Sequence, residues 1–182
     1  MANKMIILIT GGQRSGKSSY AERLALSLTD APIYMATAHV GDEEFAQRVA
    51  AHKQRRGRQW TTIEEEKYLS RHDVNGRVVV VDCMTLWCSN FFFDRHAPEH
   101  RQPSAEEALK AMKSEFDDFT AQDATFIFVT NEIGCGGISI NAVQRQFTDL
   151  QGRMNQYVAS KAGEVVLMVS GIPVKLKGKD KN

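Results

Sequence analysis

The chain has 182 residues, of which 42% are hydrophobic and 25% are charged, and its formal net charge at pH 7 is +1. These values are ordinary for a soluble globular protein, so we expect residues 1–182 to form one domain. The balanced charge gives no global attraction for nucleic acid or for an anionic membrane. No apolar run approaches the roughly 20 residues that span a bilayer, and no signal peptide opens the sequence. We therefore expect a cytoplasmic protein without membrane insertion or a nucleic-acid partner.

The three cysteines, Cys83, Cys88 and Cys135, include no CxxC pair. An odd number of cysteines without such a pair favours reduced thiols in a cytoplasmic protein. We expect each of them to pack as a small, partly buried hydrophobic side chain.

In chain order, short and continuous apolar runs predict buried parallel strands. These strands are expected at 5–10, 32–38, 77–83, 125–131 and 164–171, with an edge strand at 172–177. Helical patterns are expected between them at 17–29, 42–56, 103–119 and 142–162, and the most loop-like stretch is 94–103. Ser104 and Glu107 form a Ser-x-x-Glu capping box at one helix start. Strands that alternate with helices predict a wound, mostly parallel α/β sheet.

A glycine-rich stretch, GGQRSGKS, lies between the first predicted strand and the first predicted helix. It matches the phosphate-loop pattern G-x(4)-G-K-[ST] in the structural context that such a loop requires. Its backbone N–H groups and the helix N-terminus are suited to phosphate oxygens, its lysine to the β- and γ-phosphates, and its final serine to Mg²⁺. The loop comprises Gly11, Gly12, Gln13, Arg14, Ser15, Gly16, Lys17 and Ser18. The motif predicts binding of a nucleoside triphosphate but leaves kinase, hydrolase, switch and transferase open.

Asp82 ends the buried run VVVVD. P-loop enzymes place a carboxylate at the end of a second strand, near the metal. A buried strand tolerates a carboxylate poorly without a partner, so Asp82 is the second candidate ligand of Mg²⁺, beside Ser18. Asp82 could also cap a helix that starts at Met84, and the two roles are compatible.

Other classes of nucleotide-binding protein fit the sequence less well. A Ras-type switch recognises guanine with Asn-Lys-x-Asp after a late strand, whereas the sequence here is TNEIGCGG, with Asn131 but no following lysine and aspartate. A nucleic-acid motor would normally be larger or would carry a basic strip. These absences favour an enzyme that acts on a small molecule.

The stretch 42–60 is acidic at its start and basic at its end. A solvated amphipathic helix explains this order, because it suits the helix dipole. The alternative gives a role to His52, which lies within a cluster of cations and one helical turn after Arg48. Neighbouring cations lower the pKa of an imidazole and keep it neutral, as covalent phosphoryl or nucleotidyl transfer requires.

The other histidines have weaker cases. His39 follows the second strand, at the sheet end where ligands bind, so it is a weaker candidate for a nucleotide contact. His72, His96 and His100 lie in polar segments and are expected to face solvent.

Several stretches occur together in a characteristic order: ILITGGQRSGKSSYAE, YMATA, RVAAHKQRR, TNEIGCG and FTDLQGRMNQYVASKAGEVVLMVSGIPVKLK. Over essentially its whole length the sequence resembles the bifunctional adenosylcobinamide kinase / adenosylcobinamide-phosphate guanylyltransferase family of cobalamin biosynthesis. The resemblance implies a RecA-like, three-layer P-loop NTPase fold. It also implies that a nucleoside triphosphate, ATP or GTP, phosphorylates adenosylcobinamide and that GTP then donates GMP to that phosphate.

The same resemblance implies the roles of individual residues. The family's covalent GMP carrier corresponds to His52, and the strand-end acid corresponds to Asp82. Nucleotide contacts correspond to the phosphate loop and to Ala36, Thr37, Ala38, Lys53, Gln54, Arg55, Arg56 and Glu64. Family members are homotrimers with active sites near subunit boundaries, and we expect the same here.

The sequence departs from the family in several places. Some relatives have two adjacent histidines where this chain has Ala51 and His52, which favours the assignment to His52. Asp82 stands where glutamate is common, which predicts a different metal geometry. GISIN at 137–141 replaces a G-I-V-P sequence and lacks its proline. Two alternatives remain open: a monofunctional small-molecule kinase on the same fold, and a nucleotide-binding regulatory protein without transfer activity.

Overall fold

The computed structural model describes residues 4–38, 56–94, 97 and 102–178. This part of the chain contains a seven-stranded sheet of order β3-β2-β4-β5-β1-β6-β7. Every neighbouring pair is parallel except the antiparallel β6–β7 hairpin at one edge. The strands are β1 (Met5–Gly11), β2 (Ile33–Ala36), β3 (Thr61–Glu64), β4 (Val78–Asp82), β5 (Thr125–Val129), β6 (Glu164–Val169) and β7 (Ile172–Lys177).

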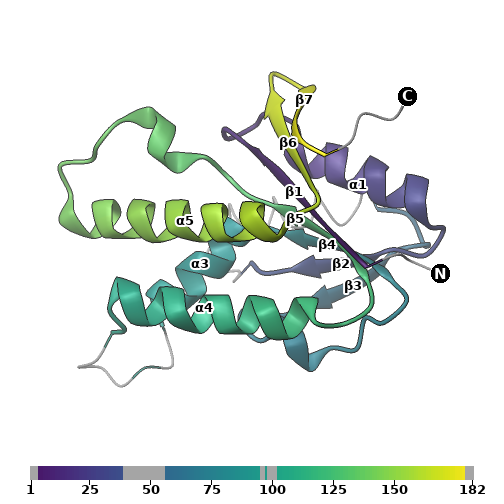
Figure 1. Cartoon of the computed structure of the whole chain (residues 1–182), viewed down its shortest axis with the longest axis horizontal. Coiled ribbons are helices and arrows are strands. Elements are labelled where there is room, and N and C mark those ends of the chain that lie inside the picture. Colours follow the sequence, from purple (N-terminus) through teal and green to yellow (C-terminus); the bar gives the residue numbers. More distant parts are fainter. Residues whose placement is uncertain (1–3, 39–55, 95–96, 98–101, 179–182) are drawn as a thin grey trace.

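Helices cover both faces of this sheet and give a three-layer α/β fold (Figure 1). The helix α1 packs on one face, and α3, α4 and α5 pack on the other. The helical elements are α1 (Lys17–Leu28), η1 (Leu69–Arg71), α3 (Met84–Phe92), α4 (Ala105–Thr120), η2 (Ile133–Gly136) and α5 (Ala142–Lys161).

The central strands are apolar on both faces because helices bury both. In β4, Val79 and Val81 join the core under α3–α5, whereas Val78 and Val80 join the core under α1. The larger core contains a group of aromatic rings: Trp87, Phe116, Phe119, Phe126 and Phe128. Burial of one such side chain contributes roughly 1.5–3 kcal/mol to the free energy of folding. Packing of these rings holds the strands, and therefore their ends, in place.

The predicted strands and the helices predicted at 17–29, 103–119 and 142–162 are confirmed, with limits that differ by at most a few residues. The edge strand at 172–177 and the capping box of Ser104 and Glu107 are both present. The sequence prediction missed β3, because its side chains are mostly exposed and its apolar pattern is weak. The predicted helix at 42–56 and most of the predicted loop at 94–103 lie outside the described residues.

Two expectations are wrong. The residue that caps α3 is Cys83, without a side-chain hydrogen bond, so Asp82 does not serve as a helix cap. Cys135 is exposed rather than partly buried, because it lies in the short turn η2 outside both cores. All three cysteines are free thiols.

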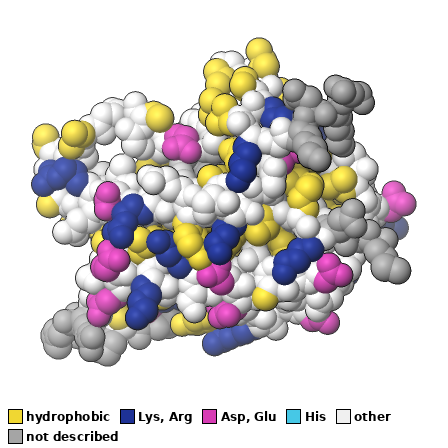
Figure 2. Space-filling view, viewed as in Figure 1, with side chains coloured by type: hydrophobic (Ala, Val, Ile, Leu, Met, Phe, Trp, Pro, Cys, Tyr) yellow, Lys and Arg dark blue, Asp and Glu magenta, His cyan; other side chains and the backbone are white. Residues whose placement is uncertain are grey.

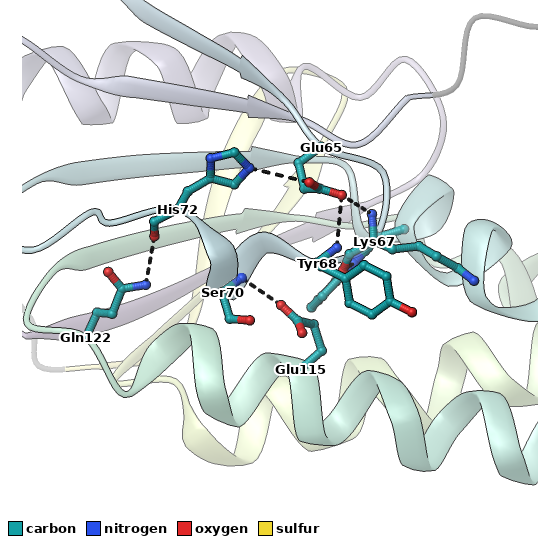
Figure 3. A network of polar contacts seen from close by, with 8 residues as sticks. Glu65, Lys67, Tyr68, Ser70, His72, Glu115 and Gln122 are labelled. Carbon is teal, nitrogen blue, oxygen red and sulfur yellow. Dashed lines mark hydrogen bonds and ion pairs between the residues drawn. The ribbon is translucent and has the colours of Figure 1, made fainter.

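A polar strap, residues 65–74, leads from β3 toward β4 along α4. Glu65 Oε1 accepts the backbone N–H groups of Lys67 and Tyr68, both at 3.0 Å, and Glu115 Oε1 of α4 accepts the N–H of Ser70 at 2.7 Å. Figure 3 shows these contacts, which we call the strap network: Glu65, Lys67, Tyr68, Ser70, His72, Glu115 and Gln122. The expectation that His72 faces solvent is only partly met, because its side chain is 33% exposed and its Nε2 lies 3.4 Å from Glu65 Oε2.

The surface over α4 and α5 carries basic and acidic side chains interspersed (Figure 2). Hydrophobic side chains gather on the β6–β7 hairpin and at the loop before α5. None of the helices in the described part of the chain combines the length and apolar character that a bilayer-spanning segment needs.

Candidate functional site

The candidate site lies where the carboxyl ends of β1, β4 and β5 meet. Strands β5 and β1 are neighbours, but the helices that follow them, α5 and α1, pack on opposite faces of the sheet. In wound parallel sheets the crevice at such a change of direction is where ligands bind. The phosphate loop, residues 11–18, occupies this position.

The glycines of the phosphate loop allow a backbone path that other residues resist. Gly11 has φ 147°, and a Cβ there would lie 2.5 Å from the carbonyl oxygen of Met168 in β6. Gly16, with φ 94°, caps α1 without any side-chain hydrogen bond to the helix. The first N–H groups of α1 are therefore not satisfied by a cap and are suited to an anion.

Lys17 is buried, with 7% of its surface exposed. Its Nζ donates to the carbonyl oxygen of Gly12 and, at 3.3 Å, to Ser15 Oγ. Burial lowers the pKa of Lys17, while Cys83 and Asp82 oppose that shift. Both of these partners are neutral, and phosphate oxygens, which carry charge, would be stronger acceptors for the same ammonium.

Asp82 ends β4 beside the loop, as predicted. Its Oδ2 accepts a hydrogen bond of 2.9 Å from the hydroxyl of Tyr34 in β2. Burial, and then the charge of Asp82, raise the pKa of Tyr34, so the phenol stays protonated and remains a donor. The guanidinium of Arg56 stacks 3.6 Å from the centre of the Tyr34 ring, and its Nη1 lies 3.8 Å from Glu22 Oε1 of α1. Arg56 thus contacts the tyrosine that orients Asp82.

Strand register brings other predicted residues into line with Asp82. Ala36 pairs with Asp82 on one side and with Glu64 on the other, so these three residues form a row across the sheet edge. Thr37 follows, but its side chain is fully buried and its hydroxyl donates to the carbonyl of Cys83 at 2.8 Å. The hydroxyl of Thr37 therefore supports the strand end. Ala38 is half-buried beside it.

Cys83 is placed next to Asp82, but its thiol is not a reactive group. Burial, with a smaller contribution from Asp82, raises the pKa of Cys83 to about 12. The thiolate is the nucleophilic form of cysteine, so Cys83 is inert at neutral pH.

Sequence reasoning missed a second group of residues at the end of β5. We call it the edge network: Thr10, Thr85, Thr130, Asn131, Glu132, Gln151 and Asn155. The hydroxyl of Thr130 donates to Asn155 Oδ1 at 2.7 Å, and Gln151 Nε2 donates to Thr85 Oγ1 at 2.8 Å. In the sequence, the signal was two amides four residues apart on a helix, whose buried positions are otherwise apolar.

Some predicted residues cannot be placed. His52, Lys53, Gln54 and Arg55 lie outside the described residues, as do His39, His96 and His100. Among the described residues, no three His, Cys, Asp or Glu side chains converge as a metal-binding group.

Comparison with known proteins gives consistent results. A family model described as "Cobinamide kinase / cobinamide phosphate guanyltransferase" matches residues 7–176. The chain is 37% identical over 182 residues to the "Bifunctional adenosylcobalamin biosynthesis protein CobU" of Escherichia coli, covering 95% of this chain and 100% of that protein. It is 37% identical over 175 residues to the CobP protein of the same description from Pseudomonas aeruginosa, covering 94% and 96%.

A solved structure supports the fold assignment. The assembled ATPase EscN from the type III secretion system of enteropathogenic E. coli aligns with a TM-score of 0.56 at 10% identity. The alignment covers 91% of this chain and 43% of that one. The predicted RecA-like, three-layer P-loop NTPase fold is confirmed.

Proposed function

The chain belongs to the cobinamide kinase / cobinamide phosphate guanyltransferase family of enzymes, and from this premise we propose that it catalyses two successive reactions. In the first, ATP or GTP phosphorylates the hydroxyl of the aminopropanol arm of adenosylcobinamide. In the second, GTP transfers GMP to that phosphate, which gives adenosylcobinamide-GDP and pyrophosphate. The observation that carries the proposal is the phosphate loop, with buried Lys17 and an α1 start that has no side-chain cap.

One phosphate loop can serve both reactions. In the kinase reaction, Lys17 and the N–H groups of α1 stabilise the charge that develops on the γ-phosphoryl group. In guanylyl transfer the attack is at the α-phosphorus, and pyrophosphate leaves. The same donors then stabilise the departing β- and γ-phosphates. The loop would thus hold the transferred end of the nucleotide in one reaction and the discarded end in the other.

His52 is the proposed nucleophile of guanylyl transfer. Its imidazole nitrogen forms a bond to the α-phosphorus, and the bond to the α–β bridging oxygen breaks, with its electron pair leaving on pyrophosphate. A phosphate oxygen of the corrinoid then displaces the histidine. Arg56 lies against Tyr34, beside Asp82. The four residues from His52 to Arg56 span at most roughly 14 Å, which allows His52 to reach this site.

The residues present fit a magnesium ion bound with the nucleotide. Asp82 Oδ2 accepts the hydrogen bond from the Tyr34 hydroxyl. No described residue forms a hydrogen bond with Asp82 Oδ1 or with the Ser18 hydroxyl. Mg²⁺ in such sites takes one or two protein oxygen ligands together with substrate phosphates and waters, so it needs no larger acidic group. Asp82 and Ser18 would hold the ion, which would neutralise charge on the phosphates.

Labelling with GTP that carries ³²P at the α-phosphate tests the covalent step. We expect an acid-labile, base-stable adduct on the wild-type protein and none on His52→Ala, which should still bind nucleotide through the phosphate loop. His72→Ala is the matched control, because His72 lies in the strap network, and it should keep the adduct. An undiminished adduct on His52→Ala would overturn the assignment. A wild-type protein that phosphorylates adenosylcobinamide but never forms an adduct would be a monofunctional kinase.

We also propose a homotrimer. The β6–β7 hairpin exposes apolar side chains that a second subunit could cover: Val169 (51% exposed), Ile172 (65%), Val174 (43%) and Leu176 (59%). Contiguous exposed apolar surface is typical of association sites. Light scattering coupled to size exclusion should give three times the 20.4 kDa subunit mass. Leu176→Lys should lower that mass, and a monomeric wild-type protein would exclude the trimer.

A further inference from the structure

Glu132 lies beside the phosphate loop, at the same edge of the sheet. It follows β5, the strand next to β1, and its backbone N–H donates to the carbonyl oxygen of Gly11 at 3.3 Å. Gly11 is the first residue of the loop. Glu132 is therefore held at the change of direction between β1 and β5, where ligands of wound sheets bind.

The two carboxylate oxygens of Glu132 have different surroundings. Oε1 accepts hydrogen bonds from the hydroxyl of Thr10 and, at 3.5 Å, from Asn155 Nδ2. Within residues 4–38, 56–94, 97 and 102–178, nothing donates to Oε2, and no cation forms an ion pair with Glu132. The edge network thus fixes one oxygen with neutral donors and leaves the other, with the charge, available to a ligand.

We propose that Glu132 is the general base of the kinase reaction, an inference that rests on the function proposed above. Oε2 accepts the proton of the acceptor hydroxyl, and the hydroxyl oxygen forms a bond to the γ-phosphorus. The bond between the γ-phosphorus and the β–γ bridging oxygen breaks, and its electron pair leaves on the nucleoside diphosphate. Glu132 later releases the proton to water. Guanylyl transfer needs no such base, because its acceptors are an imidazole and a phosphate.

The other described groups near the loop are less suited to this role. Asp82 holds the Tyr34 hydrogen bond with one oxygen and is the proposed metal ligand with the other. A metal-bound carboxylate is a poor proton acceptor. The thiol of Cys83 is protonated, and Lys17 is a cation that serves the phosphates.

The test separates the two reactions in one protein. Kinase activity is measured as transfer of γ-³²P to adenosylcobinamide, and guanylyl transfer as transfer of α-³²P from GTP to adenosylcobinamide phosphate supplied ready-made. For Glu132→Gln we expect kinase kcat to fall at least about 100-fold, the usual contribution of a general base, with the KM for nucleotide and guanylyl transfer changed less than about threefold. Glu132→Asp, which keeps a carboxylate, should recover part of the loss. Asp149→Asn removes an exposed charge from α5 and should change neither reaction.

The outcomes distinguish failure of this assignment from failure of the proposed function. If the wild type is an active kinase and Glu132→Gln keeps that kinase activity, the assignment of Glu132 as general base is overturned. An equal fall of both reactions in Glu132→Gln and Glu132→Asp, with a lowered melting temperature, would show a structural role and would also overturn it. A wild-type protein that phosphorylates no adenosylcobinamide would instead overturn the kinase half of the proposed function.

Discussion

Two polar networks support the face of the sheet that α3, α4 and α5 cover, and they differ in charge. The edge network consists of hydroxyls and amides around one carboxylate, Glu132. The strap network contains two carboxylates, Glu65 and Glu115, together with His72 and Lys67 (Figure 3). One network lies at the phosphate loop, and the other connects β3 to α4.

This difference shows how the fold uses charge. Within the described part of the chain, Glu132 is oriented by neutral donors and forms no ion pair, so its charge remains available to a ligand. The strap instead satisfies its carboxylates internally. Although burial alone would raise the pKa of Glu65, the N–H groups of Lys67 and Tyr68 and the ring of His72 hold that pKa below its ordinary value. We therefore expect changes in the edge network to affect chemistry and changes in the strap network to affect stability and its pH dependence.

The largest effect is expected from Asn155→Leu, which breaks the edge network. The Thr130 hydroxyl loses its acceptor and Glu132 loses a donor. Unfolding free energy should fall by about 1–3 kcal/mol, the cost of leaving buried polar groups without partners. Kinase kcat should fall more than about tenfold, because misplaced catalytic groups are costly, whereas guanylyl transfer should change little. Urea unfolding and the two transfer assays measure these effects.

The control for this change is Gln156→Leu on the next, exposed position of α5. It introduces the same side chain without touching the edge network, so both the stability and the kinase rate should stay near those of the wild type. Equal losses of the two activities in Asn155→Leu would mean that this network supports the whole site rather than Glu132.

A smaller effect is expected from Thr10→Val, which removes only the hydroxyl that donates to Glu132. The side chain keeps nearly the same shape, so the unfolding free energy should fall by no more than about 1 kcal/mol. Kinase kcat should fall between about three- and tenfold, because Glu132 Oε1 keeps only the Asn155 contact. Thr62→Val on exposed β3 is the matched control. A kinase rate unaffected by Thr10→Val would argue that the backbone alone positions Glu132.

In the strap network, Glu115→Gln should raise the unfolding free energy, whereas the edge-network variants lower it. Burial raises the pKa of Glu115, and the N–H of Ser70 only partly opposes this shift. The folded chain therefore binds this proton more tightly than the unfolded chain and loses stability as pH rises through the raised pKa. Glutamine keeps an acceptor for Ser70 without the charge, so it should stabilise the protein by up to about 1 kcal/mol at pH 7 and have no effect near pH 4.

Glu65→Gln provides the contrast within the same network. Because the pKa of Glu65 is lowered in the folded state, its contribution is present above the unfolded pKa and is lost as pH falls through the folded value. This variant should therefore destabilise the protein at pH 7 and converge with the wild type in acid. Chemical unfolding across pH 3–8 compares the two variants. If both variants changed the unfolding free energy in the same direction at pH 7, the opposite contributions assigned to Glu65 and Glu115 would be contradicted.

The sequence predicted those parts of the molecule that follow from local patterns. Continuous apolar runs identified five of the strands because both faces of the sheet are buried there, whereas β7 was identified as an edge strand by its proline and lysines. The phosphate loop was identified by glycine and lysine spacing. The position of Asp82 at the end of β4 was predicted because the apolar run before it predicts a buried strand. The strand β3 was missed because Thr61, Thr62 and Glu64 show no such run.

The edge network could not be predicted in the same way. Thr10, Glu132 and Asn155 are far apart in the chain, and only the pairing of β5 with β1 and the packing of α5 bring them together. Glu132 follows a strand end as Asp82 does, but its significance depends on which strand is its neighbour. Strand order is a tertiary property that periodicity does not contain.

The smallest effect is expected from Glu106→Gln, which tests how much an ion pair that is exposed to solvent contributes to stability. Arg153 of α5 donates to both Glu106 oxygens of α4, at 2.7 and 3.3 Å, in a geometry as good as any in the two networks. However, the side chains are 42% and 73% exposed, and solvent screens such pairs until they contribute little. Arg153 holds the pKa of Glu106 below its ordinary value, so any contribution of this pair to stability would appear above the unfolded pKa and vanish in acid.

We expect urea midpoints of Glu106→Gln and wild type to coincide at pH 7, in low salt and in 1 M NaCl. A midpoint shift as large as that of Asn155→Leu would mean that burial does not set the strength of these polar contacts, and the contrast between the two networks would then rest on charge alone.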